Sequence, residues 1–587
     1  MSSPETRPEA ADWDDLVDRL LPETRPRERL RATPPLPPDP RTPTQRQRAW
    51  VAARAPFAAT LVFSMLLALL LGWVATAPSP AVSPDSIQYL SAAQNLASGR
   101  GAVTTITSLE LPQNSVPFTT WPPLFPLLLS WGVEEGRAPI AWARTLQLLI
   151  LVLSFLPLAI LSWWVAGPRW AWLVLAIAAC SRPWLQLSSF VWSESLFLGL
   201  TLVALVCLVR GVAAPRTERE ARSTLAWLFA AGLFVSLATL TRYLGIAWIA
   251  VGVAVIVARC DDVRPRRAVA WLAAFILPAS LPILAWCARN AYLTGAPFGE
   301  ERSGPQPSLP QVLLDTLRTL THDLVLPPFL PEGALLLGFH VAGIVAVGFL
   351  ALCLVHRFGP QMMESGPPQR MVAGTALALT AIVYLLAVVG SSFRFAVDPI
   401  NTRLLAPLYP AVWILAVMCL RGIWSTSGPK LRAGVALSAG FLIAMSAAAG
   451  VRYATAPRET RDLTQPYWRT VLWSQPSETD RSELETLRGL PEDALVVSNV
   501  WERVALNTGL AVKPLPGDEA RDWPGSLLQH ENAYVLVDLE ARPERKGASD
   551  LEAIGQLPPG IVPVAQWKNA RLYKVRSDGF HRGAAPR

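Results

Sequence analysis

Long apolar runs alternate with short polar connections over most of the chain. A helix needs about 20 mostly apolar residues to cross the hydrocarbon core of a bilayer, and the runs of that length predict about eleven membrane spans. The fold class that we expect is an all-α polytopic membrane protein. The predicted spans are 55–77, 139–166, 168–186, 194–213, 223–241, 243–259, 268–287, 334–356, 371–390, 404–422 and 432–450.

The distribution of charge agrees with repeated membrane crossing. Hydrophobic residues make up 52% of the chain and charged residues 16%, and there are 23 Trp. The net charge of +8 comes from arginines that are scattered through short connections and form no stripe, which argues against a nucleic-acid partner. Connections at 210–222, 259–267 and 421–432 hold many of them, so the positive-inside rule places the N-terminus and these connections in the cytoplasm.

The two ends of the chain differ in composition from the middle. Residues 1–54 are polar and rich in proline, and we expect a disordered cytoplasmic leader in which Trp13 to Leu21 could form a transient acidic helix. Residues 451–587 would be external, because the number of spans is odd. Short strand-like runs at 494–500 and 533–539, and a hairpin pattern at 562–575, predict a small α/β domain with an accessory role. A capping-box pattern, Ser477 to Asp480, predicts a helix toward Leu490.

Two long external segments, 78–138 and 288–333, are candidates for chemistry, because functional groups collect on loops that rigid elements hold. In the second, apolar residues at helical spacing predict a helix on the membrane surface. They are Val312, Leu313, Leu317, Leu320 and Leu324.

The first external segment carries an acid just after the first span. Asp85 follows Ser83-Pro84, a pattern typical of a helix start, and Gly99 and Gly101 would end that helix. Asp85 also shares a helix face with Tyr89, so its carboxylate could instead act as a general base toward an acceptor. The prolines of the following segment, Trp121 to Pro126, favour a stiff elbow that returns the chain to the membrane.

Ionisable residues at the external ends of the spans predict an arginine-rich pocket with a few acids, because a charge near lipid is costly without a partner or a function. Glu194 could equally be a favourable first-turn acid, and each arginine could be a surface anchor or the partner of an acid. Together the guanidinium groups suit a phosphate or pyrophosphate. The residues are Asp85, Arg144, Glu194, Arg242, Arg289, Arg302, Arg394, Asp398 and Arg403, and Tyr243 interrupts an apolar run beside Arg242.

The six Cys lie in or beside apolar spans and the five His are dispersed, so we expect no disulfide framework and no metal site. No cofactor is expected, and a divalent metal has no positive support.

Several motifs, in this order along the chain, resemble the large polytopic glycosyltransferases that use polyprenyl-phosphate sugars. That family includes protein O-mannosyltransferases, aminoarabinose transferases of lipid A and lipopolysaccharide-core glycosyltransferases, which share a C-type fold. The resemblance covers roughly residues 55–450. The motifs are D-S-x-x-Y-L-x-x-A-x-x-L-x-x-G-x-G from Asp85, W-P-P-L-F-P, S-E at 193–194, T-R-Y-L-G, R-N at 289–290 and R-L-L-x-P-L-Y-P from Arg403.

The resemblance implies roles for individual residues. Asp85 would be the catalytic base and Glu194 a second acid of the pocket. Arg403 would contact the lipid phosphate, and so would Arg289 and Arg242. The other substrate-binding candidates are Tyr89, Tyr243, Arg302 and Arg394. One departure concerns Ser86, where many relatives have a second acid.

The resulting expectation is an inverting glycosyltransferase of the plasma (inner) membrane. It would move a hexose or pentose from a polyprenyl-phosphate donor to a lipid, glycan or protein acceptor on the external face, in the cell envelope, among membrane lipids. A transporter or lipid flippase is the alternative, although such folds show internal repeats and midplane charges. A receptor-like protein that works through residues 451–587 is a third.

Overall fold

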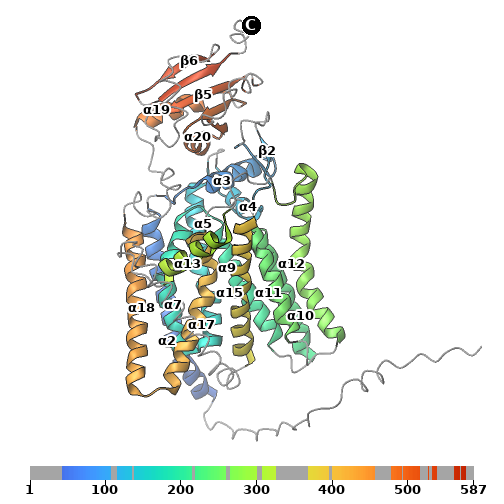
Figure 1. Ribbon diagram of the computed structural model, residues 1–587, viewed down its shortest axis with the longest axis vertical. Helices are drawn as coiled ribbons and strands as arrows, with labels where there is room; N and C mark the ends of the chain where they lie inside the picture. The colour runs from blue at the N-terminus through green and yellow to red at the C-terminus, as the bar shows by residue number, and fades with distance from the viewer. Residues whose placement is uncertain are drawn as a thin grey trace, which may run out of the picture. The chain divides into compact units, whose positions relative to one another are not determined.

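The structure is a computed structural model of the chain, shown in Figure 1. It describes residues 43–77, 79–106, 115–134, 138–213, 218–259, 265–299, 307–324, 368–394, 400–456, 478–491, 493–515, 527, 530, 532–538, 561–568 and 570–576.

Within these residues, seven helices are long and apolar enough to cross a membrane, and three shorter helices are also apolar. Every predicted span coincides with one of them except 334–356, which lies outside the described residues. The chain is therefore a multi-pass integral membrane protein. The helices are α2 (Pro43–Ala75), α5 (Ile140–Leu153) with α6 (Phe155–Ala166), α7 (Pro168–Ala179), α9 (Glu194–Val212), α10 (Glu218–Thr239), α11 (Ile246–Val257), α12 (Pro265–Thr294), α15 (Pro368–Arg394), α17 (Tyr409–Thr426) and α18 (Pro429–Thr455).

The first candidate span begins at Ala55, as predicted, but the helix that contains it, α2, begins at Pro43, inside the leader that was expected to be disordered. The predicted acidic helix in the leader lies outside the described residues. The predicted span 168–186 is too long, because α7 ends at Ala179 and a separate helix α8 (Arg182–Ser189) follows. The side chain of Ser181 accepts a hydrogen bond from the Trp184 amide, which caps the new helix.

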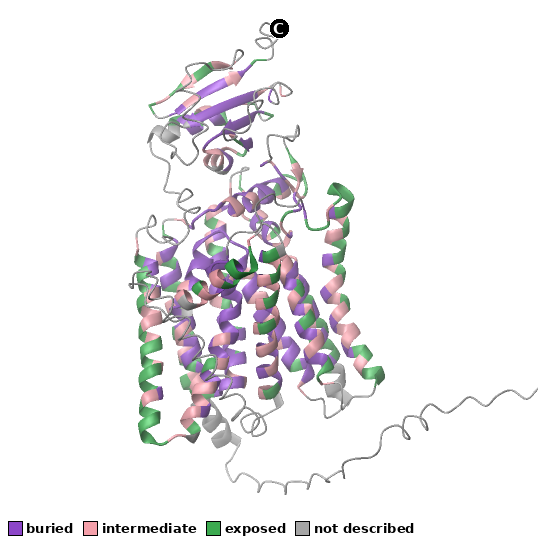
Figure 2. Ribbon diagram, in the orientation of Figure 1, coloured by how far each residue is buried: buried purple, intermediate pink, exposed green. Residues whose placement is uncertain are grey.

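Burial separates central helices from peripheral ones. Two thirds (67%) of the most apolar window is buried in both α9 and the Thr402–Ser425 span, against 11% in α18 and 22% in α12. Figure 2 shows the exposed residues running along α18 and α12. Those exposed side chains include Leu437 and Phe441, which suit a surface that faces lipid.

Short elements connect the long helices at the end where the candidate site lies. Helix α3 (Pro84–Ala97) lies across the ends of the long helices (Figure 1). A helix is present where the second long segment predicted one, as α13 (Leu309–Leu324), with Val312 and Thr316 buried and Leu313 exposed. The other short elements are β1 (Val103–Thr104), β2 (Val116–Pro117), α4 (Leu124–Ser130), η1 (Tyr243–Gly245), α16 (Thr402–Leu405) and η2 (Ala406–Leu408).

The C-terminal part is a small α/β unit, as predicted. Its sheet has the order β4-β3-β5-β7-β6; β3 pairs in parallel with β4 and β5, and β7 pairs antiparallel with β5 and β6. The predicted runs form β3, β5 and the β6–β7 hairpin, and a helix follows the predicted capping box, although Ser477 lies outside the described residues. We did not predict β4 or α20. The elements are α19 (Glu478–Arg488), β3 (Leu495–Ser498), α20 (Trp501–Thr508), β4 (Ala511–Pro514), β5 (Ala533–Asp538), β6 (Ile561–Gln566) and β7 (Ala570–Val575).

Two glycines of α18 give a matched test of helix packing. A Cβ added at Gly450 would lie 2.2 Å from the carbonyl oxygen of Cys180, whereas a Cβ at Gly440 would meet nothing within 4 Å. We expect Gly450→Ala to destabilise the protein by about 1–3 kcal/mol, because backbone has to shift. Gly440→Ala should leave stability unchanged or slightly raised, since alanine favours helix. Thermal unfolding of the purified protein, followed by tryptophan fluorescence, measures both, and equal midpoints would contradict this packing.

Candidate active site

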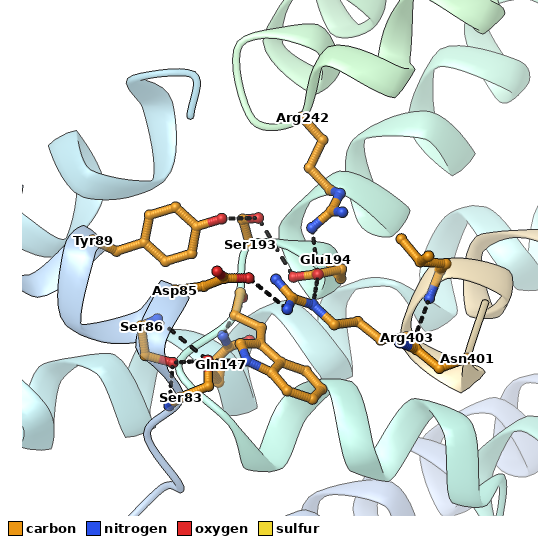
Figure 3. Close-up of polar contacts among 12 residues, drawn as sticks. Ser83, Asp85, Ser86, Tyr89, Gln147, Ser193, Glu194, Arg242, Asn401 and Arg403 are labelled. Atoms are coloured by element: carbon orange, nitrogen blue, oxygen red, sulfur yellow. Dashed lines mark hydrogen bonds and ion pairs between the residues drawn. The ribbon is translucent and has the colours of Figure 1, made fainter. Parts of the chain in front are cut away.

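Glu194 is the meeting point of the site. It begins α9, and only 1% of its side chain is exposed. Its Oε1 accepts hydrogen bonds from Arg242 Nη1 and from Arg403 Nε, so one buried carboxylate pairs with two guanidinium groups (Figure 3). Arg242 lies in the break between α10 and η1, and Arg403 lies in α16 just before α17. Three segments that are distant in the sequence therefore meet at Glu194.

Arg403 is held on several sides and still has hydrogen-bonding capacity. Its side chain is 6% exposed, and its Nη1 lies 2.6 Å from Oδ2 of Asp85. The guanidinium carbon lies 4.6 Å from the centre of the Trp192 ring, over its face, which is a cation–π contact. Among the described residues, however, none accepts a hydrogen bond from the buried Nη2 atom. A guanidinium is always charged, so leaving this buried donor without an acceptor is energetically unfavourable.

Asp85 lies in the first turn of α3, so the predicted helix start is confirmed, and the same turn places the carboxylate against Arg403. Ser83 and Ser86 form a reciprocal capping box: the Ser86 amide donates to Ser83 Oγ (3.3 Å), and the Ser83 amide donates to Ser86 Oγ (3.0 Å). Trp192 Nε1 also donates to Ser83 Oγ, at 2.8 Å. Ser86, where the sequence departs from the family that it resembles, has a structural role here, because it fixes the turn that carries Asp85.

Tyr89 supports Glu194 from α3. Its hydroxyl shares a 3.1 Å hydrogen bond with Ser193 Oγ, and Ser193 Oγ donates to Glu194 Oε2 at 3.4 Å. Burial raises the pKa of Tyr89, and the nearby carboxylates of Glu194 and Asp85 raise it further, although Arg242 and Arg403 oppose this. The hydroxyl therefore stays protonated and can donate through Ser193 toward Glu194.

Tyr243 and Arg289 belong to a neighbouring cluster that holds the segment after α3. The Tyr243 hydroxyl donates to the carbonyl of Thr119 (2.9 Å), and Asn290 Nδ2 donates to the same hydroxyl (3.2 Å). Arg289 donates to the carbonyls of Phe118 (3.3 Å) and Ala102 (2.9 Å). Both residues were predicted to bind substrate, and the structure places them on backbone carbonyls of the segment that follows α3.

The other predicted site residues do not join the Glu194 cluster. Arg144 donates to Thr76 Oγ1 and to the Trp73 carbonyl, each at 3.0 Å, at the end of α2. Arg302 and Asp398 lie outside the described residues, as does the side chain of Arg394. The structure thus brings together Asp85, Tyr89, Glu194, Arg242 and Arg403.

With this geometry in hand, the chain can be compared with known proteins. No model of a known protein family matches it, and no curated protein sequence is a detectable relative. Solved structures do match. The chain shares its fold with ArnT. The structure of ArnT from Cupriavidus metallidurans in the apo state superposes with a TM-score of 0.55 at 14% identity, and covers 92% of this chain and 100% of that chain.

Two further matches share this fold. ArnT from Cupriavidus metallidurans bound to undecaprenyl phosphate gives a TM-score of 0.52 at 14% identity over 90% of this chain and 99% of that one. The arabinofuranosyltransferase AftD from Mycobacteria gives 0.52 at 15% identity, covering 89% of this chain but 41% of that one. The predicted fold class is therefore confirmed.

Sequence reasoning missed two residues directly before Glu194. Trp192 supports the Arg403 guanidinium and Ser193 links Tyr89 to Glu194. Gln147 of α5 holds this turn, because its Nε2 lies 2.5 Å from the Trp192 carbonyl. The position of Trp192 and Ser193 in the sequence was the available signal. Both belong to the W-S-E turn that opens a span, directly before Glu194, so their side chains lie close to the partners of Glu194.

The charges of the cluster balance, since two carboxylates face two guanidinium groups. In the described part of the chain, no group of three or more His, Cys, Asp or Glu side chains is arranged to hold a metal ion. Chemically, the arrangement offers a carboxylate at the edge, Asp85, whose side chain is 18% exposed, and a cation beside it that can accept a further anion.

We expect the two acids to differ in their effect on stability. Glu194→Gln would leave two buried guanidinium groups without their shared carboxylate, and breaking such a pair costs about 3–5 kcal/mol. Asp85→Asn should cost less, because Asp85 is partly exposed and Arg403 keeps Glu194. Thermal unfolding midpoints of the purified variants measure the difference. A larger loss for Asp85→Asn than for Glu194→Gln would contradict the central position of Glu194.

Proposed function

We propose that the protein is an inverting glycosyltransferase that moves a sugar from a polyprenyl-phosphate donor to an acceptor at the external membrane face. The observation that carries the proposal is the Nη2 donor of Arg403, which is buried, charged and without an acceptor among the described residues, next to the Asp85 carboxylate. A phosphate oxygen is the kind of acceptor that guanidinium donors bind best.

The fold supports this donor class. One matching ArnT structure contains undecaprenyl phosphate. The archaeal oligosaccharyltransferase AglB from Archaeoglobus fulgidus, in complex with an inhibitory peptide and a dolichol-phosphate, has a TM-score of 0.50 at 14% identity over 89% of this chain and 74% of that one. These partners belong to those proteins, and a polyprenyl phosphate is our proposal for this chain.

The transfer step uses Asp85 as general base. An acceptor hydroxyl or amine loses its proton to the Asp85 carboxylate while its oxygen or nitrogen forms a bond to the anomeric carbon of the sugar. The bond between that carbon and the phosphate oxygen breaks, and its electron pair leaves with the phosphate. Attack from the face opposite the leaving group inverts the anomeric centre. Arg403 stabilises the charge that develops on the departing phosphate.

Donor binding would also prepare the base. Oδ2 of Asp85 is ion-paired with Arg403 Nη1 at 2.6 Å, so this oxygen is engaged by the guanidinium. A phosphate on Arg403 would compete with Asp85 for the same guanidinium and weaken this pair. The Asp85 oxygen that pairs with Arg403 would then be released and could receive the proton of the acceptor.

The remaining roles follow from the contacts. Arg242 and Ser193 donate hydrogen bonds to the Glu194 carboxylate and hold it in place. Glu194 in turn orients Arg403 by accepting a hydrogen bond from the Arg403 Nε atom. We further propose that the sugar is a hexose or pentose, that the acceptor is a lipid, glycan or protein, and that the N-terminus is cytoplasmic in the inner membrane, as the basic connections indicate.

A transporter is less well supported than a transferase. Transporters place ionisable groups near the bilayer midplane. Here the clustered charges lie at helix ends: Glu194 begins α9, Arg242 follows α10, and Arg403 precedes α17. The neighbours AglB and AftD are named as transferases.

The base assignment predicts the outcome of Asp85→Asn in cells. We expect a deletion strain to lack one class of surface glycan, wild-type protein to restore it, and Asp85→Asn protein at the same membrane level to fail. Asp315→Asn is a matched control. The Asp315 carboxylate on α13 lies outside the cluster, and its Oδ1 is 3.9 Å from Nη1 of the exposed Arg318, so the same chemical change removes only a surface ion pair. Mass spectrometry of glycolipids, polysaccharides and glycoproteins is the measurement. Full restoration by Asp85→Asn would rule out the mechanism.

Donor recognition predicts a second result, in vitro. Arg403→Lys keeps a positive charge but loses the planar set of donors, so we expect undecaprenyl phosphate to bind about tenfold more weakly, the loss of roughly one hydrogen bond to a charged group. Arg144→Lys serves as control, since Arg144 binds the end of α2. Titration of the protein in lipid nanodiscs reports both affinities. If Arg403→Lys binds as tightly as wild type, the phosphate lies elsewhere.

A further inference from the structure

A second buried carboxylate lies on α13, outside the cluster described above. The side chain of Asp323 is fully buried, with 0% exposed. Its Oδ2 accepts a hydrogen bond from the Tyr409 hydroxyl at 2.6 Å, and its Oδ1 accepts one from Thr402 Oγ1 at 3.0 Å. The ring of His322 lies 3.3 Å from Oδ1, and Arg182 of α8 lies 3.0 Å from that ring.

These contacts enclose the segment that carries Arg403. Thr402 directly precedes Arg403 in α16, and Tyr409 opens α17 after the short η2 turn. Asp323 therefore binds this segment on both sides of Arg403, at Thr402 before it and at Tyr409 after it. A third hydrogen bond adds to this attachment, because Thr319 Oγ1 of α13 donates to the Ile400 carbonyl at 3.1 Å.

A carboxylate in this place has a physical rationale. Burying a charge is costly unless hydrogen bonds compensate it, and a charged acceptor forms shorter and stronger hydrogen bonds than a neutral one. Two hydroxyl donors on one carboxylate hold α16 and the start of α17 in a single orientation. The position of Arg403 is important because its guanidinium has to contact Asp85, Glu194 and a ligand. A small displacement of such a group weakens the binding of the ligand.

We infer that Asp323 is a positioning residue: through Thr402 and Tyr409 it sets the orientation of α16, and so directs Arg403 Nη2 toward the phosphate of the donor. The inference rests on the proposed function. It gives the external segment 288–333 a role in donor binding that its amphipathic pattern alone did not indicate.

The test removes the two hydroxyl groups while keeping the shape of each side chain. We expect Thr402→Val and Tyr409→Phe each to weaken the binding of undecaprenyl phosphate to the full-length protein in nanodiscs, by about fivefold to tenfold. Thr402→Ser restores the hydroxyl and should bind like wild type. Asp323→Asn should weaken binding at least as much as either variant.

Two controls separate positioning from general packing. Thr380→Val removes a buried hydroxyl that donates to the Ala376 carbonyl within α15, and Tyr453→Phe removes one that contacts Ser189 at 2.6 Å. Both should bind undecaprenyl phosphate with wild-type affinity. Thermal unfolding midpoints of every variant show whether the compared proteins are folded.

The outcomes distinguish the two proposals. If wild-type protein binds and Thr402→Val and Tyr409→Phe bind equally well, the positioning inference is wrong while the donor proposal stands. Equal weakening by Thr402→Ser or by Thr380→Val would also overturn it, because the effect would then not depend on the hydroxyl bound to Asp323. If the wild type itself does not bind, the donor proposal fails and the inference falls with it.

Discussion

The site depends on one buried carboxylate that two arginines share. Glu194 is almost fully buried, and such a charge is stable only when ion pairs and hydrogen bonds replace the water it has lost. Arg242 and Arg403 supply them from the ends of two other spans. The ion pair therefore does two things at once: it brings the ends of distant helices together, and it leaves a guanidinium with a remaining donor at the place where they meet.

Supporting contacts connect this ion pair to Asp85, the proposed base. The Trp192 ring lies against Arg403, and its Nε1 donates to the Ser83 cap of α3, so the turn that carries Asp85 is fixed relative to the arginine. Tyr243 and Arg289 bind the backbone carbonyls of Thr119 and Phe118, which belong to the segment after α3. Trp192 therefore supports both the Asp85 turn and Arg403, while the Ser83–Ser86 cap holds the turn and Glu194 holds the arginine.

Local patterns predicted much of the fold, and they predicted the charged centre of the site. Apolar run lengths located the spans, and the cost of charge near lipid gave nine candidates, among them Asp85, Glu194, Arg242 and Arg403. What local patterns could not show is which distant segments meet. Arg289 looked like a phosphate ligand because its carbonyl partners lie far away in the sequence, and Asp323 looked like part of a surface helix although it continues the buried face of Val312 and Thr316. The early end of α7 depended on a weak local signal, the cap at Ser181.

Binding of the donor phosphate to Arg403 can be seen directly in a structure of the protein with undecaprenyl phosphate. We expect a phosphate oxygen about 3 Å from Arg403 Nη2, with the Asp85–Arg403 pair lengthened relative to 2.6 Å. A phosphate bound away from Arg403, with the Asp85–Arg403 pair unchanged, would contradict it.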